Sequence, residues 1–122
     1  MILVFGGAYQ GKLDFVKKEY GISESDIFNC SQDEAKIDLN KKVIYGFEKY
    51  VMACVKAGIS AQGIIDEFKE HIVICNDVSG GIVPIDKEQR AMREMTGRGM
   101  IAMADKSETV IRVFCGLVQR LK

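Results

Sequence analysis

Met1-Ile2-Leu3-Val4-Phe5-Gly6-Gly7-Ala8-Tyr9-Gln10-Gly11-Lys12 is an apolar run that leads into a glycine-rich segment and then a lysine. The apolar residues predict a strand, the glycines a turn, and the residues from Lys12 onward the start of a helix. Counted from Gly6, the spacing is that of G-x-x-x-x-G-K, a phosphate-binding loop. In such a loop, backbone N–H groups, the positive end of the following helix and the lysine all face the phosphates. We therefore expect a nucleotide to bind to Gly6, Gly7, Ala8, Tyr9, Gln10, Gly11, Lys12 and Leu13.

One position departs from the phosphate-loop pattern. The residue after the lysine is normally Ser or Thr, whose hydroxyl holds Mg²⁺, and here it is Leu13. A strand–turn–helix corner that binds no ligand would give the same short pattern, so both interpretations stand. The apolar strand before the glycines and the amphipathic stretch after them favour a phosphate site. Leu13 argues against the usual catalysis at that site.

Composition limits the classes of function. The chain has 122 residues, which suits one domain over residues 1–122, and 48% of them are hydrophobic. Lys+Arg and Asp+Glu both number 17, so the net charge of zero predicts neither nucleic acid nor an anionic membrane as a partner. The apolar segments are shorter than the roughly 20 residues that span a bilayer. Residues 1–5 carry no charge and run straight into the glycine loop, so they do not resemble a signal peptide.

Cysteine and histidine usage indicates the compartment and excludes some metal sites. The four cysteines are far apart in the sequence and form no C-x-x-C pair, so we expect reduced thiols in a cytoplasmic protein: Cys30, Cys54, Cys75 and Cys115. His71 is the only histidine, which argues against a histidine-based zinc site.

Hydrophobic periodicity predicts alternating strands and helices. The expected elements are a strand over 1–5, a helix over 12–20, a short strand over 26–30, a loop over 31–42, a helix from Ile44 to Val55, a shorter helix from Ser60 to Phe68, a strand over 72–75, a helix from Asp86 to Ala104, a strand over 109–115 and a short tail. Gly21 and Gly58 are the expected helix ends, and Ser60 and Asp86 the expected N-caps. This alternation predicts an α/β fold with a mostly parallel sheet between helical layers, of the P-loop NTPase-like three-layer kind.

Parallel sheets bind ligands beyond the carboxyl ends of their strands. Two segments meet that description here, Gly6–Lys12 and Asn76–Gly81. Asp77 follows the apolar run 72–75 as a Walker B carboxylate would, and could hold Mg²⁺ or orient an attacking hydroxyl. The alternative is a loop aspartate in an Asx-turn.

The second segment carries a more specific resemblance. Asn76-Asp77-Val78-Ser79-Gly80-Gly81-Ile82-Val83-Pro84 resembles the N-E-V-G-x-G-I-V-P segment of the bifunctional adenosylcobinamide kinase/adenosylcobinamide-phosphate guanylyltransferases. The similarity continues through Arg90, Arg93, Glu94, Gly97 and Arg98, and returns at Val113-Phe114-Cys115-Gly116-Leu117 and at Leu121-Lys122. With the opening strand and loop, it covers roughly half of the chain.

The resemblance implies a P-loop protein of cobalamin assembly. Family members phosphorylate a hydroxyl of adenosylcobinamide and then transfer GMP from GTP through a guanylylated histidine, and trimers occur among them. For this chain it implies GTP or ATP with Mg²⁺, a corrinoid substrate and a homo-oligomer. Lys12 and Asp77 would be the catalytic residues, with Asp77 serving the metal. Arg90, Arg93 and Arg98 would contact phosphates or the corrinoid, or else form the solvated face of a helix beside Glu88 and Glu94.

Several residues depart from the family pattern. Besides Leu13, Asp77 replaces a glutamate and Ser79 a glycine. Residues 29–42 contain no histidine or arginine where the family carries its nucleophile, and His71 does not match that position. We therefore expect guanylyl transfer to be lost. Two hypotheses remain: a cobinamide kinase-like phosphotransferase, and a non-catalytic nucleotide- or corrinoid-binding module that acts as a partner or regulator.

Overall fold

The apolar run that opens the sequence forms strand β1 (Ile2–Gly6) in the interior of a sheet. A computed structural model describes residues 1–8, 10–78 and 86–122, and in it six strands take the order β2-β3-β4-β1-β5-β6. The remaining strands are β2 (Ile27–Asn29), β3 (Val43–Tyr45), β4 (Ile72–Asn76), β5 (Thr109–Phe114) and β6 (Leu117–Arg120). Neighbours from β2 to β5 pair in parallel, and β6 pairs with β5 in the antiparallel sense. The predicted α/β fold with a mostly parallel sheet is confirmed.

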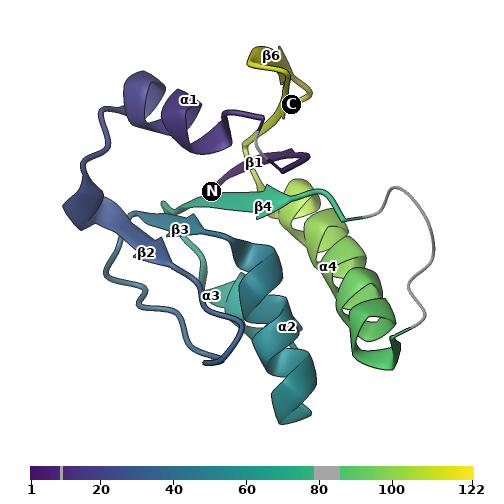
Figure 1. Ribbon diagram of the computed structural model, residues 1–122. Helices are drawn as coiled ribbons and strands as arrows, with labels where there is room; N and C mark the ends of the chain where they lie inside the picture. The colour runs from purple at the N-terminus through teal and green to yellow at the C-terminus, as the bar shows by residue number, and fades with distance from the viewer. Residues whose placement is uncertain (9, 79–85) are drawn as a thin grey trace.

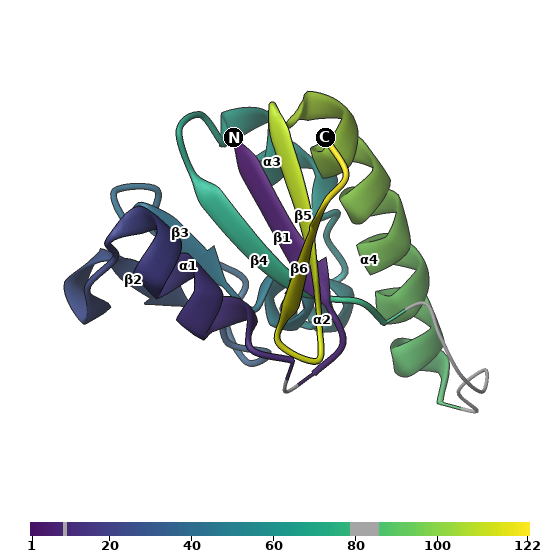
Figure 2. The ribbon, with the colours of Figure 1, turned by 90° about the horizontal axis from the view of Figure 1, so that it is seen from above.

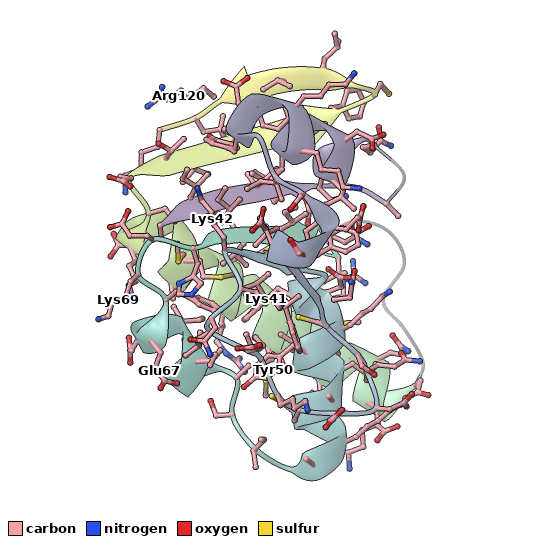
Figure 3. All side chains as sticks on the ribbon, turned by 90° about the vertical axis from the view of Figure 1, so that its left-hand side faces the viewer. Lys41, Lys42, Tyr50, Glu67, Lys69 and Arg120 are labelled. Atoms are coloured by element: carbon pink, nitrogen blue, oxygen red, sulfur yellow. The ribbon has the colours of Figure 1, made fainter. Side chains whose placement is uncertain are left out.

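Helices cover both faces of this sheet (Figure 1). The helix α1 (Lys12–Tyr20) packs on one face, and α2 (Phe47–Ala57), α3 (Gln62–Glu67) and α4 (Lys87–Lys106) pack on the other. Side chains alternate between the faces of a strand, so Val4 joins the α1 side of the core and Leu3 the opposite side. Figure 3 shows Tyr50 and Glu67 on the side of α2 and α3, and Arg120 at the β6 end of the molecule.

The connections that follow β1 and β4 lead to opposite faces of the sheet. From β1 the chain passes to α1 on one face, whereas from the neighbouring β4 it leads to α4 on the other. Seen from above, β1 lies between β4 and β5, with α1 and α4 on opposite sides (Figure 2). When the connections of two adjacent parallel strands lead to opposite faces, the loops that follow the strands diverge. Ligands of α/β proteins bind between such loops.

Three sequence-based expectations about the elements are wrong. Ile44 lies in β3 rather than in a helix, and α2 begins only at Phe47. The residues after Gly116 form β6 rather than a tail. The Ser60 hydroxyl accepts a hydrogen bond from the Gln62 N–H in a turn, and the N-cap of α3 is Ala61.

The predicted helix ends and the predicted state of the thiols agree with the structure. Gly21 and Gly58 take left-handed conformations that end α1 and α2, and the Asp86 carboxylate caps α4 through the N–H groups of Glu88 and Gln89. All four cysteines are free thiols, and Cys115 alone among them is exposed. Within the residues described, no helix is both long enough and apolar enough to cross a membrane.

Candidate phosphate site at the carboxyl ends of the strands

The glycine loop begins where β1 is crowded by its neighbour β5. A Cβ atom on Gly6 would lie 2.2 Å from the carbonyl oxygen of Val113, so only glycine fits at this position. At the other end of the loop, Gly11 has φ 89° and starts α1 at Lys12. Because a left-handed conformation favours glycine, the backbone geometry explains Gly11 as well. Tyr9 lies outside the described residues.

The loop is held by the turn between β5 and β6. Cys115 and Gly116 form that turn, both with positive φ (50° and 75°), as a two-residue hairpin of the I′ kind requires. The backbone N–H of Cys115 donates to the side-chain oxygen of Gln10, and the N–H of Gly116 donates to the backbone oxygen of Gln10 at 3.2 Å. A segment near the end of the chain therefore positions the loop near its start.

Lys12 is buried in spite of its charge, with 5% of its surface exposed. Its ammonium group donates a hydrogen bond to the carbonyl oxygen of Gly7 at 2.6 Å, so the side chain folds back over the loop that precedes it. Burial lowers the pKa of Lys12, and the Glu48 carboxylate and Cys75 thiol nearby act in the opposite direction. A buried lysine needs compensating charge or hydrogen bonds, and a bound phosphate would supply both.

A pocket of about 400 Å³ lies between the glycine loop and the ends of β3 and β4. Its lining comes from three segments that are distant in the sequence: Ala8, Gln10, Gly11, Lys12, Leu13 and Asp14; Tyr45, Gly46, Glu48 and Lys49; Ile74 and Asn76. Leu13 lines the pocket and is half-buried, with the rest of its side chain against the core beneath α1.

Glu48 is a buried pocket residue that the sequence did not single out. It lies in the first turn of α2, where a carboxylate usually has no role beyond interacting with the helix dipole. Here, however, only 8% of its surface is exposed. Its Oε1 atom accepts a hydrogen bond from the backbone N–H of Asn76 at 2.9 Å. Gly46, with φ 82°, makes the sharp turn from β3 into α2 that places Glu48 beside Lys12.

Asp77 lies outside the residues that line the loop pocket. Its backbone N–H donates to the carbonyl oxygen of Gly6 at 2.8 Å, which continues the pairing of β4 with β1. Its exposed side chain lines a second, largely apolar pocket of about 360 Å³, together with Phe5, Val78, Gly97, Met100 and Ile101. The structure thus brings Lys12 together with Glu48, and places Asp77 in a second pocket that shares no lining residue with the first. The rest of the segment, Ser79–Pro84, lies outside the described residues.

The three arginines lie along α4. Arg90 and Arg98 are exposed, and Arg98 lies 3.9 Å from Glu94 in an ion pair one turn apart. Arg93 is half-buried. Among the described residues that line the loop pocket there is no arginine.

His71 lies at the other end of the sheet. It immediately precedes β4, so about five residues at roughly 3.3 Å each separate it from the loop pocket at the far end of that strand. Its Nδ1 atom accepts from the Lys69 N–H at 3.0 Å, so Nε2 carries the proton and donates to the Leu39 carbonyl oxygen at 2.8 Å. Both ring nitrogens are thus engaged by the backbone.

No family model and no curated protein matches this sequence.

Proposed function

We propose that the pocket beside Lys12 binds the phosphates of a nucleoside triphosphate, GTP or ATP, and that the fold is of the P-loop NTPase type. The observation that carries this proposal is the buried Lys12 ammonium, held over a glycine loop that joins β1 to the amino end of α1. The pocket lies at the carboxyl ends of parallel strands, where α/β proteins bind ligands. Its volume of about 400 Å³ is within the range of small-molecule sites.

The activity proposed for this site is phosphoryl transfer of the adenosylcobinamide kinase type, in a cytoplasmic protein. Support comes from the segments that resemble that family, because the opening one contains the glycine loop and the segment 113–117 contains the turn that holds it. Lys12 and the loop N–H groups would bind and orient the triphosphate. Asp77, in the second, apolar pocket, would orient the hydroxyl of an acceptor such as a corrinoid.

The residues present fit Mg²⁺ only in part. Leu13 supplies no oxygen, but Glu48 and Asp14 both line the pocket and have carboxylate oxygens, which Mg²⁺ prefers. In the part of the chain described, no group of three or more possible ligands forms a complete metal site. Mg²⁺ usually keeps several waters and reaches such sites with substrate phosphates, where it neutralises their charge.

One observation favours the alternative, a non-catalytic binding module. Leu13 packs partly into the core, so the position that normally helps to fix the metal has become structural. A protein of this kind would keep the nucleotide or corrinoid and act as a partner or regulator.

Self-association into a homo-oligomer, a trimer by the same resemblance, is part of the proposal. Four large apolar side chains are exposed at the β5–β6 edge of the sheet: Phe114, Leu117, Val118 and Leu121. Exposed apolar patches of this kind are typical of protein interfaces.

The test of nucleotide binding is calorimetric titration of the protein with ATP and GTP, beside the variants Lys12→Ala and Lys56→Ala. Lys12→Ala should weaken binding by roughly 1.5–3 kcal/mol, the scale of a lost charge-assisted hydrogen bond. Lys56, exposed in the last turn of α2, should be neutral when changed. Equal affinity in the two variants, or no binding by the unmodified protein, would exclude the proposed site.

A further inference from the structure

We propose that Glu48, rather than Asp77, is the carboxylate that receives the Mg²⁺ carried by a bound triphosphate. The inference rests on the proposed nucleotide binding and goes beyond it, because it assigns the metal to a residue outside every segment on which the family resemblance is based. Asp77 then has no metal role and serves the acceptor pocket alone.

The first step of the argument is the burial of the Glu48 charge. More than nine-tenths of this residue is buried, and burying a carboxylate is costly unless it is paired or hydrogen-bonded. The contacts that compensate here are the Asn76 N–H on Oε1 and the nearby ammonium of Lys12. A second carboxylate oxygen, Oε2, lies over Gly46, at the wall of the pocket.

The second step concerns what a triphosphate would encounter in this pocket. Lys12 would turn from the Gly7 carbonyl toward the phosphates and so attract them. Glu48, in the same pocket, would repel them, because like charges at short range are unfavourable where water is excluded. A divalent cation between the carboxylate and the phosphates turns this repulsion into attraction. The buried carboxylate is therefore compatible with a nucleotide that arrives as its magnesium complex.

The third step is the oxygen that the loop lacks. With Leu13 in place of a hydroxyl residue, the metal needs another protein ligand at this end of the sheet. Mg²⁺ bound to nucleotides commonly takes one or two carboxylates, with phosphate oxygens and waters completing six-fold coordination. Glu48, in the first turn of α2, is hydrogen-bonded to Asn76 at the end of β4, and both line the loop pocket, whereas Asp77 lines a different pocket.

The experiment compares triphosphate affinity in Mg²⁺ and in EDTA for the unmodified protein, Glu48→Gln and the matched control Asp77→Asn. Mg²⁺ should raise affinity at least about fivefold in the unmodified protein and in Asp77→Asn, as expected for coupled binding. In Glu48→Gln the gain should fall to about twofold or less, and affinity in EDTA should rise above that of the unmodified protein because the repulsion is gone. Glutamine keeps the acceptor for the Asn76 N–H, and thermal melts report whether the variant folds.

A second measurement needs no variant. With the triphosphate bound, Mn²⁺ in place of Mg²⁺ should broaden the amide resonances of Gly46 and Glu48 more than that of Gly97 in the second pocket. Equal metal dependence in all three proteins, or broadening centred on Gly97, would overturn the assignment of Glu48 while leaving nucleotide binding intact. Absence of any triphosphate binding, with or without metal, would instead refute the proposed function itself. Loss of phosphoryl transfer in Glu48→Gln with unchanged metal dependence would also overturn the assignment.

Discussion

The Gln10 side chain accepts a hydrogen bond from the backbone N–H of Cys115, although 105 positions separate the two residues in the sequence. The contact ties the proposed phosphate loop to the β5–β6 turn. A phosphate loop must present its N–H groups in one arrangement, so a fixed support lowers the conformational cost of binding.

Replacing Gln10 with alanine should therefore affect both stability and binding. Loss of the side-chain bond should lower the free energy of unfolding by about 0.5–1.5 kcal/mol, and triphosphate affinity should fall because the loop is less ordered. Urea denaturation and calorimetry measure the two effects. Gln62→Ala, at the exposed start of α3, serves as the control and should leave affinity unchanged. Identical melts and affinities for the two variants would show that the contact has no energetic role.

Leu13→Ser should strengthen metal dependence at a cost in stability. The new hydroxyl supplies the oxygen that the loop lacks, so Mg²⁺ should increase triphosphate affinity more than it does in the unmodified protein. Because Leu13 is only half-buried, the loss of stability should be roughly 1–2 kcal/mol, below the 2–5 kcal/mol of a fully buried leucine. Thermal melts run beside the titrations separate the effects. A folded variant with no gain in metal dependence would favour the non-catalytic module.

Guanylyl transfer should be absent. A covalent route needs a nucleophile at the bound nucleotide, and His71 lies at the opposite end of β4 with both ring nitrogens hydrogen-bonded to backbone atoms. Incubation with GTP labelled at its α-phosphate should leave no acid-labile label on the protein. A phosphoramidate mapped to His71 by mass spectrometry would contradict this prediction.

Stability should fall at alkaline pH because of buried thiols. Burial raises the pKa of Cys30 from 9.0 to about 12, and it raises the pKa of Cys75 as well. Between pH 9.0 and about pH 12, the unfolded chain releases the Cys30 proton and the folded protein keeps it. The free energy of unfolding therefore falls as pH rises through this range. The slope for one thiol approaches about 1.4 kcal/mol per pH unit.

Urea denaturation at about pH 8 and about pH 10 measures this loss. The free energy of unfolding of Cys30→Ala should depend less on pH than that of the unmodified protein. Because Cys115 is exposed, Cys115→Ala should show the same pH dependence as the unmodified protein. If the two variants showed the same pH dependence, buried Cys30 would not be the cause.

The sequence was sufficient for the fold class because its strongest signals are local. The apolar runs of β1, β4 and β5 and the glycines that end α1 and α2 are visible without tertiary information. Ile44 was misassigned because β3 is only three residues long and its apolar residues continue the helical spacing of α2. Only the left-handed Gly46 separates the two elements, and a glycine alone does not reveal its φ angle.

The candidate site could be predicted only on its loop side. Lys12 follows from a spacing rule, whereas Glu48 requires knowing that β3 lies beside β4, since burial comes from packing between segments. Asp77 was expected near the phosphates because it follows a strand. Successive residues of an extended chain point to opposite faces, however. Asn76 lines the loop pocket, whereas Asp77, the next residue, lines the second pocket.

The central place of β1 has a consequence for the order in which the chain folds. Ile2 pairs with Ile72 on one side and with Thr109 on the other, so β1 precedes both of its partners by more than half of the chain. Pairings of such long sequence separation form slowly, since much chain entropy is lost before the contacts form. During synthesis, the second edge of β1 stays uncovered until β5 has been made. Nucleotide binding at the carboxyl end of β1 would then report that both of its neighbouring strands are in place.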